Sequence, residues 1–128
     1  MDVAIDAARR AGSLLLDNLG KIKKIEFKAK NSLVTRADRD SEELIISILN
    51  ESYPAHGIFA EESGRRSESA EYIWIIDPLD GTTNYAHGYP FFSVSIALEI
   101  NGAVVLGLVY DPVKEEMFTA ELGKGATL

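Results

Sequence analysis

The chain has 128 residues, a formal net charge of −7 and no cysteine. This length predicts one domain able to bury a hydrophobic core, and the lack of cysteine excludes a disulfide framework, thiol catalysis and a thiolate metal site. The net negative charge and the lack of a stretch dense in lysine and arginine argue against a nucleic-acid polymer as partner. The sequence shows neither a signal-like N-terminus nor an apolar run of transmembrane length. We therefore expect a cytoplasmic protein without a membrane partner.

Two helices are expected in the first part of the chain. Residues 2–19 carry apolar side chains at helical spacing, and Gly20 is placed to end that helix. A second helix is expected from Thr35, because Thr35-x-x-Asp38 has the form of a capping box in front of an apolar periodic run. Between the helices, residues 22–28 alternate weakly among lysines and are predicted to form an edge strand defended by charge.

The rest of the chain is expected to be rich in β-strands. Its β-branched and aromatic runs predict strands at 57–60, 72–76, 92–100, 103–110 and 116–122. The polar residues 64–71 are expected to form an exposed loop. Asn101-Gly102 is a strong signal for a two-residue hairpin. The two histidines, His56 and His87, are expected to be ordinary loop residues.

The strand at 103–110 is apolar on both faces, with Val104, Leu106 and Leu108 on one face and Val105 and Val109 on the other. A strand of this kind needs cover on both of its faces. The two helices can cover one face of the sheet, and nothing else in the chain is expected to cover the other. We therefore expect a homo-oligomer that buries this second face.

The most informative stretch runs from Asp77 to Asn84 and follows the strand at 72–76. Pro78 fixes its own φ and removes a backbone donor, so the chain is expected to leave the sheet there. Asp77 and Asp80 can converge on one hard cation, with the intervening carbonyl groups as further oxygen ligands. The amides after Gly81 are expected to open a short helical turn, which suits phosphate. The stretch therefore predicts a carboxylate metal site beside an anion cradle.

Other interpretations of this stretch compete with a metal site. Asp, Pro and Gly are common turn residues, so a purely structural turn explains each of them singly. A calcium loop of the EF-hand type fails, because the third position after Asp77 is Leu79 and the twelfth is Gly88. Covalent phosphoaspartate chemistry also fails, because the nucleophile position of an Asp-x-Asp-Gly-Thr motif is occupied by Pro78.

The stretch Asp77-Pro78-Leu79-Asp80-Gly81-Thr82-Thr83-Asn84 resembles the metal-binding motif of the inositol monophosphatase family. Glu61-Glu62-Ser63 resembles that family's other acidic motif at the right distance upstream, Leu33-Val34-Thr35 through Asp38 resembles an earlier motif, and Gly123-Lys124-Gly125-Ala126 resembles the turn after its first sheet. The resemblance runs over nearly the full length and implies an α+β fold. It implies two N-terminal helices packed on a mostly antiparallel six-stranded sheet, the first half of an α/β/α/β/α layered sandwich.

The resemblance also implies a reaction, the hydrolysis of a small phosphate monoester such as inositol monophosphate by metal-activated water. The implied metal is Mg²⁺, with Mn²⁺ or Ca²⁺ able to substitute, and its implied ligands are Glu61, Asp77, Leu79 (through its carbonyl) and Asp80. The implied catalytic residues are Asp38, Thr82 and Glu61, of which Thr82 is hydrogen-bonded to Asp38. The implied phosphate-binding residues are Gly81, Thr82 and Asp80. A family lysine near the metal is best matched by Lys28, with Lys30 next.

The sequence leaves the substrate and the completeness of the site open. Fructose 1,6-bisphosphate and a 3′-phosphonucleotide are alternative substrates, and a non-catalytic, self-associating metal-binding module is an alternative of another class. The family's second half, which carries a Trp-Asp motif with a further aspartate for the second metal, does not occur in residues 1–128. We therefore expect a metal-binding N-terminal half with weak or no activity of its own.

Overall fold

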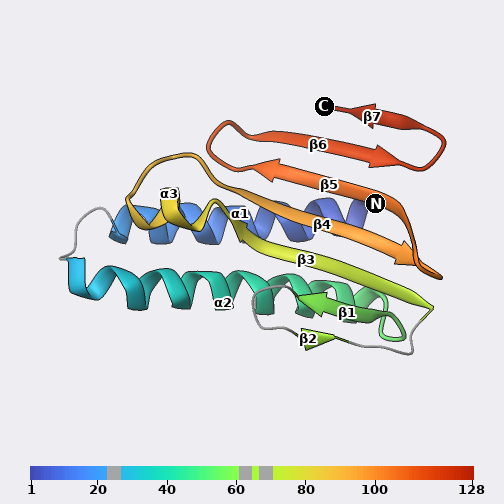
Figure 1. Cartoon of the computed structure of the whole chain (residues 1–128), viewed down its shortest axis with the longest axis horizontal. Helices are drawn as coiled ribbons and strands as arrows, with labels where there is room; N and C mark the ends of the chain where they lie inside the picture. Colours follow the sequence, from blue (N-terminus) through green and yellow to red (C-terminus); the bar gives the residue numbers. More distant parts are fainter. Residues whose placement is uncertain (23–26, 61–64, 67–70) are drawn as a thin grey trace.

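The computed structural model of the chain describes residues 1–22, 27–60, 65–66 and 71–128. Within them, helices α1 (Asp2–Ile22) and α2 (Phe27–Ser52) lie side by side and pack on one face of a mostly antiparallel sheet (Figure 1). The expected α+β fold class is confirmed. None of the helices in the described ranges is long and apolar enough to cross a membrane.

Helix α1 packs closely because its buried stripe is made of small residues. Ala4, Ala7, Ala8 and Ala11 are fully buried, and they recur at the spacing of one helix face. At Gly12 the helix touches the sheet so closely that a Cβ would lie 2.7 Å from the Tyr110 ring. The helix predicted over residues 2–19 is confirmed, but it continues two residues beyond Gly20, where it was expected to end.

Helix α2 begins earlier than the sequence pattern indicated. Phe27 and Lys28 are helical, so the edge strand expected over 22–28 is wrong at these residues, and 23–26 lie outside the described ranges. Thr35 lies inside the helix and does not cap it. The physical reason is that residues 27–52 contain no glycine or proline to interrupt a helix, and the weak alternation at Phe27 and Lys28 did not outweigh helix propensity.

The described strands form one sheet in the order β2-β1-β3-β4-β5-β6-β7 (Figure 1). Its strands are β1 (Gly57–Ala60), β2 (Arg65–Arg66), β3 (Tyr72–Asp80), β4 (Ser93–Ile100), β5 (Ala103–Asp111), β6 (Glu116–Glu121) and β7 (Gly125–Thr127). Only β1 and β3 pair in parallel among these neighbours. Seven described strands stand where six were expected, because the short β2 and β7 extend the sheet at its two edges, while Ile22, Phe27 and Lys28 of the expected edge strand are helical.

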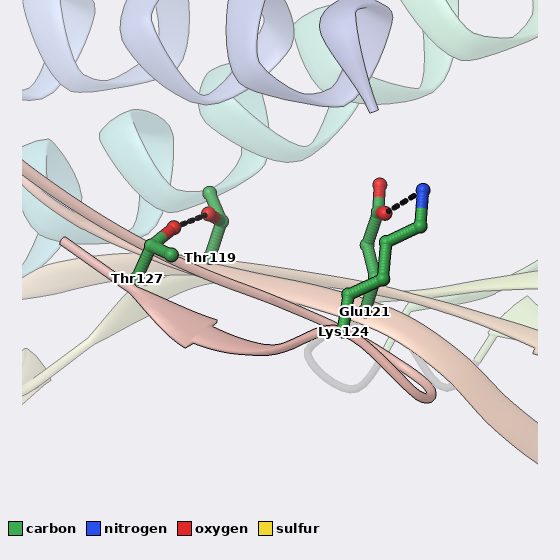
Figure 2. A network of polar contacts seen from close by, with 4 residues as sticks. All are labelled: Thr119, Glu121, Lys124 and Thr127. Atoms are coloured by element: carbon green, nitrogen blue, oxygen red, sulfur yellow. Dashed lines mark hydrogen bonds and ion pairs between the residues drawn. The ribbon is translucent and has the colours of Figure 1, made fainter.

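The sequence had not predicted the two short edge strands, β2 and β7. Arg65–Arg66 pair with β1 inside the stretch expected to be a loop, and the rest of that stretch before Glu71 lies outside the described ranges. Strand β7 is tied to β6 by Thr119 and Thr127, whose hydroxyl oxygens are 2.8 Å apart, and by an ion pair of 3.1 Å between Lys124 and Glu121. Figure 2 shows both pairs projecting from the sheet toward the helices.

The hairpin between β4 and β5 was predicted correctly, but a β-bulge follows its turn, which the sequence had not predicted. Asn101 and Gly102 have φ of 49° and 86°, as a type I′ turn requires. After the turn the register shifts, so that Val104 pairs with Glu99 while Leu106 pairs with Leu98. This bulge moves Val104 off the face that it was expected to share with Leu106, and Val104 is 54% exposed.

The sheet face away from the helices is apolar, and we call it the open face. Cross-strand pairing places on it Ile73, Ile75, Ala97, Val104, Val109 and Phe118. Where the small residues Ala97, Gly107 and Ala120 pair across three strands, the surface has a shallow hollow of about 260 Å³. No described helix covers this face, as expected because the two predicted helices can cover only one face of the sheet.

An aromatic stack closes the turn between α2 and β1. The His56 ring lies between the rings of Tyr53 and Tyr72, with centroid distances of 4.8 and 4.7 Å. Its Nδ1 accepts a hydrogen bond of 3.0 Å from Nε1 of the buried Trp74. His87 is exposed, in line with the expected loop residue. For His56 that expectation was wrong, because its ring satisfies a buried indole N–H.

Candidate metal and phosphate site

Strand β3 does not end where Pro78 predicted. The strand continues to Asp80, and the ladder to β4 passes from the pair Asp77↔Ser95 directly to the pair Asp80↔Ser93. One more residue therefore stands on β3 than on β4 between these pairs, which is a β-bulge. Proline is tolerated at a bulge because no N–H is needed there.

The bulge decides where the two aspartates lie. In a regular strand, residues three apart point to opposite faces of the sheet. The shift brings Asp80 opposite Ser93, and side chains of paired residues share one face. Asp77 and Asp80 are consequently both on the open face, Asp77 partly exposed and Asp80 exposed. The structure thus places both aspartates on the same face of the sheet, by a route that the sequence did not indicate.

The inner side of the bulge is buried against α2. Pro78 is fully buried and Leu79 is 2% exposed. Ser41 of α2, itself 0% exposed, donates a hydrogen bond of 2.9 Å from its Oγ to the Pro78 carbonyl. Asp38 lies nearly one helical turn earlier on α2 and is 3% exposed. The candidate catalytic aspartate is therefore a buried group on the helix that supports the bulge.

The chain turns sharply at Gly81 and enters the short helix α3 (Thr82–Ala86), which confirms the expected helical turn. Gly81 has φ of 89°, and a Cβ there would lie 2.8 Å from the Phe91 carbonyl oxygen. The Thr82 Oγ1 donates to the Leu79 carbonyl at 3.2 Å. The Leu79 oxygen keeps a second lone pair for a cation.

Helix α3 is anchored to α1 by a buried tyrosine. The Tyr85 hydroxyl donates to the Leu15 carbonyl at 2.7 Å, and its ring meets Phe92 edge-on at 4.9 Å. Burial raises the pKa of the Tyr85 phenol, because the charged form is poorly solvated there. This neutral, buried tether holds the turn that follows the two aspartates.

Several expected site residues lie beyond what the structure describes. Glu61 and Glu62 fall outside the described ranges, and so do the side chains of Lys28 and Lys30. Within the described ranges no three carboxylate, histidine or cysteine side chains gather as a metal site. The donor set on β3, two carboxylates and a carbonyl oxygen, nevertheless fits a hard divalent cation. Sequence reasoning missed Ser41, whose one signal was its place three residues after Asp38.

Comparisons with known proteins show which family the chain resembles. A family model described as "Inositol monophosphatase family" matches residues 1–128. "Nus factor SuhB" of Pasteurella multocida is 44% identical over 131 residues, covering 100% of this chain and 49% of that protein. "Inositol monophosphatase 2" of Solanum lycopersicum is 45% identical over 133 residues, covering 100% of this chain and 50% of that protein.

Solved structures give the same result at the level of the fold. The extragenic suppressor protein suhB from Bartonella henselae superposes with a TM-score of 0.87 at 42% identity, over 99% of this chain and 50% of that one. Inositol monophosphatase from Anabaena superposes with a TM-score of 0.83 at 45% identity, over 99% of this chain and 45% of that one. The chain spans about half the length of the curated relatives that it matches.

Proposed function

The chain belongs to the inositol monophosphatase family, and on this premise we propose that it supplies the metal-binding half of an enzyme that hydrolyses a small phosphate monoester. One observation carries the proposal. The bulge of β3 places Asp77 and Asp80 on one face of the sheet, immediately before the Gly81 turn. Clustered carboxylates at a strand end are the ligands that Mg²⁺ prefers, and a substrate phosphate commonly completes its coordination.

In this proposal the ligands of the cation are Asp77, Asp80, the Leu79 carbonyl and Glu61. Mg²⁺ is the proposed metal, and Mn²⁺ or Ca²⁺ would use the same oxygens. When bound, the metal would supply Lewis-acid activation of water and neutralise charge on the phosphate.

The chain's own groups would position substrate and water. The amides of Gly81 and Thr82 would donate to phosphate oxygens, because they open α3 next to the carboxylates. Asp38, buried on α2, would accept a hydrogen bond from the attacking water, and the Thr82 oxygen would orient it. For this role the Thr82 hydroxyl keeps its acceptor lone pairs while its proton is held by the Leu79 carbonyl.

Inositol monophosphate is the substrate that we propose first. The relatives "Inositol monophosphatase 2" and "Inositol monophosphatase 3" of Solanum lycopersicum support it through their names. Fructose 1,6-bisphosphate and a 3′-phosphonucleotide remain the alternatives, because the groups proposed here would bind the phosphate that all three substrates share.

We propose that residues 1–128 alone are weakly active or inactive. Relatives are about twice as long, and the family resemblance assigns a further carboxylate of the second metal to the other half. Loss of one preorganised electrostatic contact typically lowers turnover by about 10²–10³-fold. The isolated chain should therefore turn over at least about a hundredfold more slowly than a complete relative.

The test joins residues 1–128 to the second half of the Solanum lycopersicum "Inositol monophosphatase 2" and measures Mg²⁺-dependent phosphate release from inositol 1-phosphate. Fructose 1,6-bisphosphate and a 3′-phosphonucleotide are assayed beside it. We expect an active chimera, loss of activity in Asp77→Asn and no loss in Asp17→Asn, which removes the same charge from the exposed surface of α1. A folded chimera that is inactive, or one that stays active with Asp77→Asn, would contradict the proposal.

The relatives called Nus factor SuhB favour a second candidate function. This name is printed for proteins of Pasteurella multocida, Vibrio cholerae and Pseudomonas aeruginosa. In that case the chain would act as such a factor through binding a partner, a role that its acidic charge alone did not predict. The chimera's Asp77→Asn variant separates the two candidates, because a binding role should survive it.

We further propose that the chain on its own self-associates through the open face. Its five strands from β3 to β7 span about 20 Å at a strand spacing of about 4.8 Å, and strands about 25 Å long give a face of about 500 Å². Stable interfaces use about 600 Å² or more per partner. A second copy of this chain would therefore have to cover the open face and part of its rim.

A further inference from the structure

Two side-chain hydroxyls engage the backbone of the β3 bulge. Ser41 Oγ donates to the Pro78 carbonyl at 2.9 Å, and Thr82 Oγ1 donates to the Leu79 carbonyl at 3.2 Å. These two carbonyl groups belong to the residues that the ladder to β4 skips. The two hydroxyls therefore replace partners that a regular ladder would have provided.

The Ser41 bond is the deeper of the two. Ser41 is 0% exposed, Pro78 is fully buried, and the bond joins residues 37 positions apart in the sequence. A buried carbonyl without a partner is costly, so the bulge and the hydroxyl depend on each other. Ser41 reaches the bulge from the helix side, whereas Asp77 and Asp80 project on the open face.

We propose that Ser41 is a positioning residue for the divalent cation. By holding the Pro78 carbonyl toward α2, Ser41 fixes the extra residue of the bulge and so keeps the Asp77 and Asp80 carboxylates on one face. This inference rests on the proposed metal site and adds a residue to which neither the motif nor the family resemblance gave a role. Groups that hold metal ligands from behind typically change metal affinity by about 10–100-fold when they are removed.

A purely structural role makes a different prediction. If Ser41 only stabilises the fold, Ser41→Ala lowers the melting temperature and leaves the affinity for metal unchanged. If Ser41 positions the ligands, the affinity falls at a temperature where the variant is still folded. The dissociation constant for Mn²⁺, measured on folded protein, therefore separates the two roles.

The experiment titrates Mn²⁺ into the 128-residue chain and follows free Mn²⁺ by electron paramagnetic resonance, with Mg²⁺ as competitor. The variants are Ser41→Ala, Asp77→Asn and Ser47→Ala, the last a matched control because Ser47 is an exposed serine of the same helix. Circular dichroism first establishes that each variant is folded. Ser41→Cys, which keeps a similar volume with a weak donor, serves if Ser41→Ala does not fold.

We expect Ser41→Ala, or Ser41→Cys in its place, to raise the dissociation constant about tenfold or more. Asp77→Asn should raise it at least as much, and Ser47→Ala should match wild type. A Ser41 variant within about twofold of wild type, while Asp77→Asn loses affinity, would overturn the role of Ser41 and leave the metal site standing. Equal binding by wild type and Asp77→Asn would overturn the metal site itself, and the role of Ser41 with it.

Discussion

Replacing Gly81 with alanine perturbs the turn that joins the two aspartates to α3. Gly81 has φ of 89° and ψ of 37°, a left-handed conformation that costs an L-residue about 1–2 kcal/mol. A Cβ would also lie 2.8 Å from the Phe91 carbonyl oxygen and 3.3 Å from the Phe92 Cα. Both are backbone atoms, so the facing segment must move, at a cost of about 1–3 kcal/mol. We expect Gly81→Ala to lower the free energy of unfolding by about 2–5 kcal/mol.

Gly102→Ala provides the matched control for this prediction. Gly102 has φ of 86°, but no atom lies within 4 Å of the position that a Cβ would take there. It should therefore show the backbone cost of about 1–2 kcal/mol alone. Urea denaturation followed by Trp74 fluorescence measures both variants against wild type. Equal losses of stability in the two variants would refute the close approach between the Gly81 turn and Phe91.

Three other substitutions and one control test the Tyr85 tether, the aromatic stack around His56 and the open face. Tyr85→Phe removes a buried hydrogen bond to α1 and should lower the free energy of unfolding by about 1 kcal/mol at pH 7. Because burial raises the pKa of Tyr85 in the folded state, wild-type stability should fall as the pH rises above the unfolded-state pKa of about 10. Urea titrations should show a smaller fall in the variant, which lacks the phenol. His56→Ala leaves the Trp74 indole N–H buried without its acceptor and should lower the free energy of unfolding by about 1–3 kcal/mol, whereas His87→Ala, at an exposed position, should leave it unchanged in the same assay. Phe118 is 45% exposed on the open face, and we expect it to lie in the contact between two copies of the chain. Sedimentation should show Phe118→Glu as a monomer and the wild type as a dimer or larger. A monomeric wild type would count against that interface.

Local patterns in the sequence predicted much of the fold. Asn101-Gly102 gave the hairpin, because both positions need positive φ and these residues tolerate it. The predicted strand at 92–100 corresponds to β4, in which the alternating residues Val94 and Ile96 are fully buried. The motif from Asp77 to Asn84 located the candidate site, since its residue types already carry the chemistry.

The errors share a physical cause in non-local structure. A bulge depends on the register with a neighbouring strand, so the extra residue at Pro78 and the outward turn of Val104 could not be read from either strand alone. The Ser41 bond joins two elements whose contact is set by the packing of α2 on the sheet. At Phe27 a weak alternation competed with helix propensity and lost.

The location of a bound cation decides whether the β3 bulge creates a metal site. The measurement is the broadening of backbone amide signals in two-dimensional NMR spectra as Mn²⁺ is added below equimolar amounts. The amides of Gly81, Thr82, Ser93 and Ser95 should broaden first, because Asp77 and Asp80 lie on the open face opposite these serines. Asp77→Asn should abolish that selectivity. Broadening that is uniform over the acidic surface, or that begins on α1, would contradict the site.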